Sequence, residues 1–116
     1  MGKFFRSKKR KAYDKINRKH RKELIKLING SHEWDWMWLH DSVIMQITHM
    51  YSYYLSADFV WQTDETRIPI VEQLQHVLEL NEELKRAMDE CDDDRERELY
   101  KEIYSYIGEH IMYWWD

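Results

Sequence analysis

The sequence contains few residues that interrupt helices and almost no cysteine. Its 116 residues include one proline, three glycines and one cysteine, so no internal disulfide can form. No apolar run approaches the ~18 residues that a membrane-spanning helix needs. The N-terminal residues are charged and lack the apolar segment and the small-residue cleavage site of a secretory signal. We therefore expect a protein of a reducing cytosol.

Charge is distributed very unevenly along the chain. Residues 1–30 hold twelve of the eighteen Lys and Arg but two of the twenty-two acids, a formal charge of +10, whereas residues 31–116 carry −14. We predict a basic N-terminal helix or arm, residues 1–30, and one acidic, aromatic-rich helical domain, residues 31–116. The basic segment suits the acidic body of the same or a neighbouring subunit, an anionic ligand such as a nucleotide, or a membrane surface. The negative body disfavours duplex nucleic acid.

Apolar residues recur at intervals of three and four, which predicts an all-α protein, a small bundle of about four helices. The first is a basic amphipathic helix that stops at Asn29 and the glycine after it. The second is predicted near residues 32–56. Ser31 is its expected N-cap, and Glu33 and Asp35 lie in the first turn, where the helix dipole favours acids.

The second half of the chain predicts two more helices. Residues 57–68 break the apolar period and are expected to connect the second helix to the third. Pro69 suits the first turn of that third helix, because a proline there loses no helical hydrogen bond. Asp93 and Glu96 form a variant of the capping box for a fourth helix, which we expect to run to the end of the chain.

The densest group of chemically capable side chains lies at residues 32–41, with three Trp, two His and three acids. Helical spacing places Trp34, Trp38 and Asp41 on one face, and Asp35 also shares a face with Trp38. Indoles stack on nucleobases and carboxylates accept hydrogen bonds from ribose hydroxyls, so these residue types suit a nucleotide pocket. The alternative is that these Trp side chains form core or interface.

A nucleotide held there would place its phosphates against the basic helix, and the connection around Trp61 would close over it. The predicted ligand-binding residues are Trp34, Asp35, Trp36, Trp38, Asp41, Trp61, Arg67, Lys15, Arg18, Lys19 and Lys22. The alternative for the basic residues is a solvated helix that is held on the acidic body by charge.

One pattern suggests metal chemistry. His40 and Asp41 resemble the doublet of HD-type metal phosphohydrolases, but neighbouring helical positions point about 100° apart. Such a pair would need ligands from other helices, and His49, His76 and His110 have no diagnostic spacing. A histidine on an apolar helix face is more often a core residue, so we expect no metal here.

The acidic residues also imitate a known site. Glu79 with Glu82, and Glu90 with Asp93, resemble the paired carboxylates of all-α nucleotide pyrophosphohydrolases, which hold Mg²⁺ between two helices. Only seven residues separate the pairs, so we expect solvated faces and a cap. Cys91 lies among these acids, which disfavour a nucleophilic thiolate. We therefore expect no enzyme and no cofactor; a metal-dependent phosphohydrolase is the minor alternative.

Two aromatic runs frame the body, Trp34-Asp35-Trp36 at the start of a long helix and Tyr113-Trp114-Trp115-Asp116 at the end of the chain. With the Glu-rich helix between them, they resemble a family of small tailed-bacteriophage proteins over roughly residues 25–116. The family has no characterised activity, so the resemblance implies only a phage origin and the cytoplasm of an infected bacterium. His40, Asp41 and His49 depart from the family, where Lys-rich helical sequence is usual.

These observations lead to two hypotheses of function. The first is a phage accessory protein that sequesters an anionic nucleotide signal of bacterial antiviral defence without catalysis. The second is a protein-interaction module, or an inhibitor of a host protein, that uses an exposed Trp surface. We expect no membrane partner. The small core favours a homo-oligomer over a monomer, with Trp114 and Trp115 sealing the core or a subunit interface.

Overall fold

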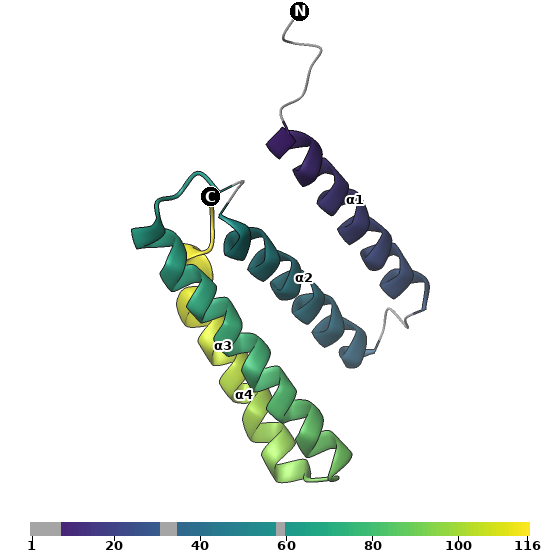
Figure 1. Cartoon of the computed structure of the whole chain (residues 1–116). Coiled ribbons are helices and arrows are strands. Elements are labelled where there is room, and N and C mark those ends of the chain that lie inside the picture. Colours follow the sequence, from purple (N-terminus) through teal and green to yellow (C-terminus); the bar gives the residue numbers. More distant parts are fainter. Residues whose placement is uncertain (1–7, 31–34, 58–59) are drawn as a thin grey trace, which may run out of the picture.

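The computed structural model describes residues 8–30, 35–57 and 60–116 (Figure 1). In this part of the chain the structure is all-α, as predicted, and has no strand. Its elements are α1 (Lys8–Asn29), α2 (Trp36–Ser56), α3 (Asp64–Asp89), α4 (Asp93–His110) and the short 3₁₀ helix η2 (Ile111–Tyr113). None of the described helices has both the length and the apolar character needed to cross a membrane.

The helices run alternately down and up, and α1 lies on the side of α2 away from α3 (Figure 1). The molecule measures 60 × 36 × 21 Å, and its radius of gyration is 16.8 Å. A compact domain of this length would have a radius of gyration of about 13 Å. The protein is therefore open and flat, with α1 attached as a single outer helix.

The core lies between α2, α3 and α4. Its fully buried side chains are spaced three, four or seven residues apart on α3 and α4, so that each helix turns one apolar face inward. They are Leu74, Val77, Leu84, Leu99 and Ile103. Burial of each such side chain contributes about 1.5–3 kcal/mol to the stability of the fold. This burial holds the α3–α4 pair together and positions α2 against it.

The end of the chain folds back onto this core. After η2, Trp114 is only 7% exposed, and its Nε1 donates a hydrogen bond of 2.9 Å to Oε1 of Gln73 in α3. Its predicted role in sealing the core is confirmed. Trp115 is 68% exposed and does not seal the core. The prediction that α4 reaches the end of the chain is wrong, because this helix ends at His110.

The predicted start of α2 is also wrong. The helix begins at Trp36, and Asp35 is its N-cap, with a carboxylate oxygen that accepts from the backbone N–H of Met37 at 3.0 Å. Asp caps as well as Ser does, and its charge also favours the helix N-terminus. The predicted cap Ser31 and Glu33 lie outside the described residues.

The starts of α3 and α4 differ from the predictions by five residues and by one. Helix α3 begins at Asp64, so Pro69 lies in its second turn. Proline is tolerated there at the loss of one backbone hydrogen bond near the exposed end of the helix. Helix α4 is capped by Asp92, which accepts from the N–H of Arg95 at 3.1 Å. The capping box predicted at Asp93 is therefore wrong.

The junction between α3 and α4 is a tight helix stop. Cys91 has a φ of 55°, in the left-handed region. The N–H of Asp92 donates to the carbonyl of Ala87 at 2.9 Å, and that of Cys91 to Met88 at 3.1 Å. These two bonds form a Schellman motif, in which glycine usually takes the position of Cys91. The thiol is exposed.

Replacing Cys91 by Gly should therefore stabilise the protein by about 0.5–1 kcal/mol. A side chain in the left-handed region costs about 1–2 kcal/mol, and glycine removes this cost. Glycine also gives the unfolded chain more conformational entropy, which offsets part of the gain. Urea unfolding monitored by circular dichroism measures the difference. Cys91→Ala is the control, since Ala keeps the Cβ. Equal stabilisation by both variants would show that the backbone angle is not the cause.

Candidate functional site

A cavity of about 280 Å³ lies between α1 and α2. We call it the α1–α2 cleft. Its walls combine aromatic rings with side-chain amides, which suits a planar polar ligand better than an aliphatic one. Helix α1 contributes Tyr13, Ile16, Asn17 and His20, and helix α2 contributes Gln46, His49, Met50, Ser52, Tyr53 and Tyr54.

Aromatic and polar contacts hold α1 against α2. The rings of Tyr13 and Tyr53 meet edge to face, with centroids 6.1 Å apart. The imidazoles of His20 and His49 are parallel, with centroids 3.7 Å apart, and Nε2 of His49 lies 3.1 Å from a carboxylate oxygen of Glu23. Tyr13 and His20 are seven residues apart, which is about two helical turns, so both lie on the side of α1 that faces α2. Between them the helices leave the cleft open.

A second hollow, of about 640 Å³, adjoins the cleft on α1. It shares Tyr13 and Asn17 with the cleft and otherwise holds four basic residues and Asp14, whose carboxylate lies 3.7 Å from Nε of Arg10. Its lining is Arg10, Lys11, Tyr13, Asp14, Asn17, Arg18 and Arg21. We call the guanidinium groups of Arg10, Arg18 and Arg21 the arginine shelf. The Arg10 guanidinium lies 5.3 Å from the centre of the Tyr13 ring, so the shelf begins at the mouth of the cleft.

Of the four basic residues of α1 predicted to bind phosphate, one lies in the shelf and three do not. Arg18 lies in the arginine shelf. Lys15, Lys19 and Lys22 are exposed and line neither the cleft nor the shelf. Helical geometry turns these three lysines about 40–100° away from Arg18, and further from Arg10 and Arg21 at the middle of the shelf.

The structure brings together three of the residues predicted at the start of α2. Asp35, Trp38 and Asp41 line a hollow of about 330 Å³, in which Lys26 of α1 supplies the one basic group. Two carboxylates beside one ammonium repel rather than attract a phosphate. Nε1 of Trp38 is buried and has no hydrogen-bond partner among the described residues. An anion therefore fits this hollow less well than the cleft.

The remaining aromatic residues of the predicted site are dispersed. Trp36 meets Tyr100 of α4 edge to face at 5.2 Å, on the core side of α2. Trp61 lies beyond the other end of α2, about 30 Å away along a helix of 21 residues. The loop around Trp61 therefore does not lie over the start of α2. Trp34 lies outside the described residues.

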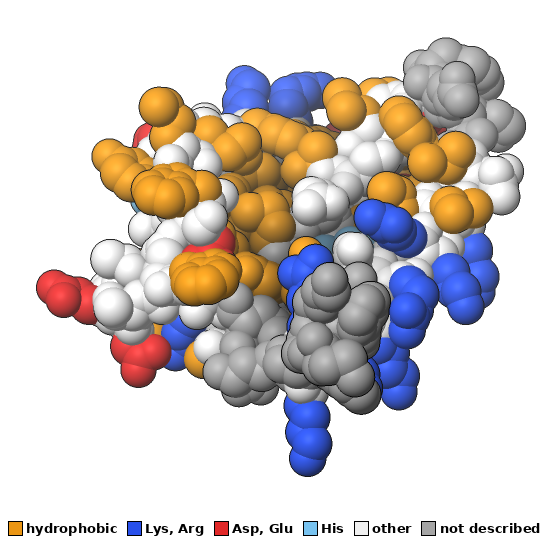
Figure 2. All heavy atoms as spheres, turned by 90° about the horizontal axis from the view of Figure 1, so that it is seen from above, with side chains coloured by type: hydrophobic (Ala, Val, Ile, Leu, Met, Phe, Trp, Pro, Cys, Tyr) orange, Lys and Arg blue, Asp and Glu red, His pale blue; other side chains and the backbone are white. Residues whose placement is uncertain are grey.

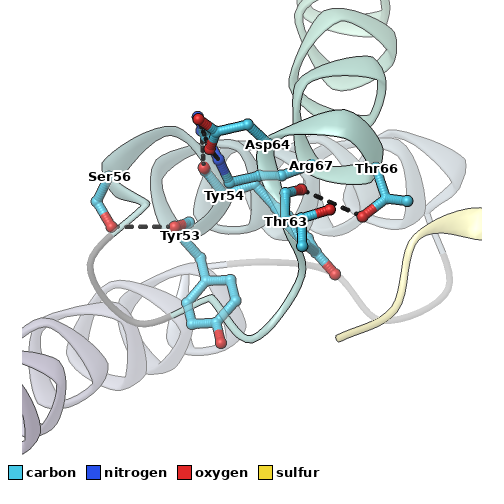
Figure 3. Close-up of polar contacts among 7 residues, drawn as sticks. All are labelled: Tyr53, Tyr54, Ser56, Thr63, Asp64, Thr66 and Arg67. Carbon is cyan, nitrogen blue, oxygen red and sulfur yellow. Dashed lines mark hydrogen bonds and ion pairs between the residues drawn. The ribbon is translucent and has the colours of Figure 1, made fainter.

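The guanidinium of Arg67 is held by hydrogen bonds within the fold and is not open to a ligand (Figure 3). Its Nη1 donates 2.8 Å to the carbonyl of Tyr54 near the end of α2, and its Nε and Nη2 donate to one carboxylate oxygen of Asp64. The last carbonyls of a helix lack helical partners, so a guanidinium satisfies one of them here. Arg67 joins α2 to α3 and does not reach the cleft.

His40 is buried in the core and fully hydrogen-bonded. Its Nε2 donates 2.8 Å to Oδ1 of Asn81, and its Nδ1 accepts from the hydroxyl of Tyr104 at 2.7 Å. An amide oxygen only accepts, which fixes the proton on Nε2. Asp41 points to the exposed side of α2. Together with burial, the larger cause, its charge raises the pKa of Tyr104.

The other described histidines contact tyrosines, apart from the stacked pair of His20 and His49. His76 packs on Tyr106, and Nδ1 of His110 donates to the carbonyl of the same Tyr106. Across residues 8–30, 35–57 and 60–116, no three His, Cys, Asp or Glu side chains are placed to hold a metal ion. The acids of the other motif, Glu79 and Glu82, are exposed on α3, as expected for a solvated face.

Acidification should loosen α1 from α2. Burial, and next the charge of His49, lower the pKa of His20 below its usual 6.5, and the hydrogen bond from His49 lowers the pKa of Glu23. The neighbouring Lys19 lowers both. Docked α1 therefore binds protons more weakly than detached α1, and its docking is lost as the pH falls below 6.5. The contribution of Glu23 to docking is lost only as the pH falls below 4.5, the ordinary pKa of this carboxyl group.

Hydrogen exchange of the α1 amides at a series of pH values from about 7.5 to 5.5 tests this expectation. After correction for the intrinsic pH dependence of exchange, the protection of the α1 amides should fall on acidification while the protection of the α3 amides stays high. His20→Gln should remove much of the pH dependence, and His110→Gln, on the other side of the molecule, should not. An unchanged pH profile in His20→Gln would contradict the assignment.

Comparison of the chain with protein families, with curated proteins and with solved structures gives no match. The resemblance to a phage family therefore stays a prediction, and the site must be interpreted from its own geometry. Sequence analysis placed a ligand between the basic and the aromatic helix but missed the lining residues Tyr13, Asn17 and Gln46. The signal for Tyr13 and Asn17 was their helical spacing on the α2-facing side of α1, and Gln46 on α2 gave no distinct signal.

Proposed function

We propose that the protein binds, without catalysis, a nucleotide-like anion in the α1–α2 cleft. One observation carries the proposal: Tyr13 and Asn17 line both the cleft and the adjoining hollow that contains the arginine shelf. A ligand with a planar ring in the cleft would place a phosphate against the shelf. The ligand class is the predicted one, but the aromatic contacts move from the Trp cluster to the Tyr and His rings of the cleft.

The chemistry of the walls supports this ligand. A base that stacks on an aromatic side chain gains ~1–3 kcal/mol. The amides of Asn17 and Gln46 offer both donors and acceptors to the edge of a base. Guanidinium groups bind phosphate through paired, charge-assisted hydrogen bonds. The volume of about 280 Å³ lies at the small end of ligand sites, so one base with its ribose fills it.

The biological setting belongs to the same proposal. In an infected bacterium, a phage protein that removes a nucleotide signal of antiviral defence needs tight binding and no reaction. Its efficiency would depend on affinity and on the number of copies made. A binding site assembled from two helices and a set of arginines supplies what this role requires.

The experiment is native mass spectrometry of the protein freshly purified from bacteria, followed by calorimetry with a nucleotide panel. We expect Arg18→Gln and Arg21→Gln each to weaken binding about tenfold, because each removes a charge-assisted bond worth ~1.5–3 kcal/mol. Lys15→Gln and Lys19→Gln make the same charge change at residues that line neither the cleft nor the shelf and are the matched controls. No uptake of any nucleotide, or equal losses in all four variants, would overturn the proposal.

A second candidate is a protein-interaction module that uses the aromatic end of the chain. Trp61 is 91% exposed there, close to the exposed Met112, Tyr113 and Trp115. The carboxylate of Asp116 accepts from the N–H of Trp61 at 3.0 and 3.1 Å, which holds the chain end beside the α2–α3 connection. Large aromatic side chains of this kind dominate binding energy at protein interfaces. In this case Trp61→Ala would abolish partner binding, whereas Arg18→Gln would leave it intact.

A further inference from the structure

The carboxylate of Asp116 accepts hydrogen bonds from two other parts of the chain. The hydroxyl of Tyr53, in the last turn of α2, donates to it at 2.6 Å. The backbone N–H groups of Trp61 and Gln62, in the connection between α2 and α3, donate to it at 3.0 and 3.1 Å. One side chain therefore joins the C-terminal segment to the end of α2 and to the α2–α3 connection. We call these hydrogen bonds the Asp116 clasp.

The clasp is stronger than a single surface contact. A carboxylate only accepts, and its bond with the Tyr53 hydroxyl has the short length typical of charge-assisted bonds. Burial, and next this bond, raise the pKa of Tyr53 above its usual 10, so the hydroxyl keeps its proton and donates. The side chain of Gln62 adds a bond to the carbonyl of Trp115, and Trp114 is buried in the core. Asp116 is therefore held in place by the segment around it as well as by its own bonds.

Tyr53 is also a wall of the α1–α2 cleft. Its side chain lines the cleft, and its ring meets the ring of Tyr13 edge to face. Tyr13 in turn lines both the cleft and the hollow that contains the arginine shelf. The hydroxyl of a tyrosine lies on the long axis of its ring, so an acceptor that holds the hydroxyl selects one side-chain rotamer and one direction of the ring. A series of contacts thus leads from Asp116 through Tyr53 to the mouth of the shelf.

The clasp lies at the end of the molecule where α2 ends and the C-terminal segment returns (Figure 1). There the ring of Tyr53 points away from Arg67, which joins α2 to α3 (Figure 3). Seen from above this end, hydrophobic side chains, tyrosines among them, spread across the molecule, and many Lys and Arg lie toward the right, the side of α1 (Figure 2). The clasp therefore acts on the aromatic side that faces α1, whereas Arg67 acts on the side of α3.

We infer that Asp116 is a positioning residue of the α1–α2 cleft, which holds Tyr53 as one of the walls and so sets the affinity of the cleft for its ligand. Tyr53 touches the ligand, whereas Asp116 acts through Tyr53. Where it concerns a ligand, the inference rests on the proposed function. The position of the Tyr53 ring can be measured without a ligand, so the two can fail separately.

Removing the acceptor should weaken ligand binding by a moderate factor. Without the carboxylate of Asp116, the ring of Tyr53 gains other rotamers, and a ligand must then order the ring when it binds. The ordering of one such side chain weakens binding about fivefold. Tyr53→Phe removes the same hydrogen bond from the other partner and keeps the ring, so we expect it to have the same effect as Asp116→Ala.

The first test is the nuclear Overhauser effect between the rings of Tyr13 and Tyr53, measured in the full chain without ligand. The wild type should show it, because the two rings meet edge to face with centroids 6.1 Å apart. Asp116→Ala should abolish it, while the protection of the α1 amides from hydrogen exchange remains. Glu65→Ala removes an exposed carboxylate at the same end of the molecule and is the matched control. A ring contact that is absent from the wild type, or unchanged in Asp116→Ala, would overturn the inference.

The second test is calorimetry with ATP or, if another member of the nucleotide panel binds more tightly, with that nucleotide. Asp116→Ala and Tyr53→Phe should each weaken binding about fivefold, and the double variant no further, because both changes remove one hydrogen bond. Tyr51→Phe removes a hydroxyl from α2 at a residue that lines neither hollow, and should bind as the wild type does. Unchanged affinity in Asp116→Ala, additive losses, or equal weakening by Tyr51→Phe would overturn the inference. If no nucleotide binds but Asp116→Ala abolishes the ring contact, the proposed function fails and the positioning of Tyr53 is supported.

Discussion

Trp114→Ala is expected to lower the free energy of unfolding by about 3–5 kcal/mol, the usual cost of deleting a buried tryptophan. The indole is 7% exposed and closes the end of the core after α4 and η2. Its removal exposes the apolar residues beneath it and leaves Oε1 of Gln73 without the 2.9 Å hydrogen bond from Nε1. Urea unfolding followed by circular dichroism measures the loss.

The neighbouring tryptophan is the natural control. Trp115→Ala removes the same side chain one residue later, where it is 68% exposed, and should change the stability by less than about 0.5 kcal/mol. Trp114→Phe keeps most of the apolar contact but loses Nε1, so it should fall between these values. Comparable losses at Trp114 and Trp115 would show that the chain end does not pack as described.

Replacing Asn81 by Leu should cost about 2 kcal/mol, because it leaves the buried Nε2–H of His40 without an acceptor. His40→Leu should cost a similar amount by leaving the amide of Asn81 without its partner. The double variant should lose less than the sum of the two, by at least about 1 kcal/mol, since an apolar pair needs no hydrogen bond. Urea unfolding of all four proteins completes the cycle.

Gln75→Leu is the control for this cycle, because Gln75 is exposed on the same helix. It should change the stability little and should show no coupling to His40. Additive losses at His40 and Asn81 would contradict the hydrogen bond between them. Strong coupling would show that the polar network fixes the register of α2 against α3.

The different attachment of α1 and α4 has a functional consequence. Helix α4 is held by fully buried apolar side chains, such as Leu99 and Ile103, whereas α1 is held by ring contacts and the ion pair of His49 with Glu23. Detaching α1 therefore needs much less free energy than unfolding the core. A ligand in the cleft contacts both helices and would stabilise the docked form by mass action. Ligand binding and the pH response of His20 are expected to be linked.

The sequence predicted the helices well because their signals are local. Apolar spacing placed α1, α2, α3 and α4, and Asn29 with its following glycine placed the end of α1. The errors lie at helix starts, where several neighbouring residues are equally capable caps. Asp35 and Asp92 act as caps, and the sequence offered Ser31 and Asp93 as well.

The candidate site was less predictable, because it depends on which side chains different helices bring together. Trp36 and Trp61 were both predicted to contact one ligand, yet they lie at opposite ends of α2, about 30 Å apart. Arg67 was predicted to bind the ligand, but in the structure one of its donors is bonded to the carbonyl of Tyr54. The residues that form the cleft are common types whose importance comes from the register of α1 against α2.

By itself, the sequence determined an all-α chain that begins with a strongly basic helix and continues as an acidic one, whereas only the structure separated the buried Trp114 from the exposed Trp115. The features that the sequence determined follow from composition and from periods of three and four, which each segment carries alone. The tertiary structure decided that His40 is a buried structural residue and that Asn17 lies across a cleft from Gln46. Such pairings depend on the register between helices, and packing sets that register across residues far apart in the chain.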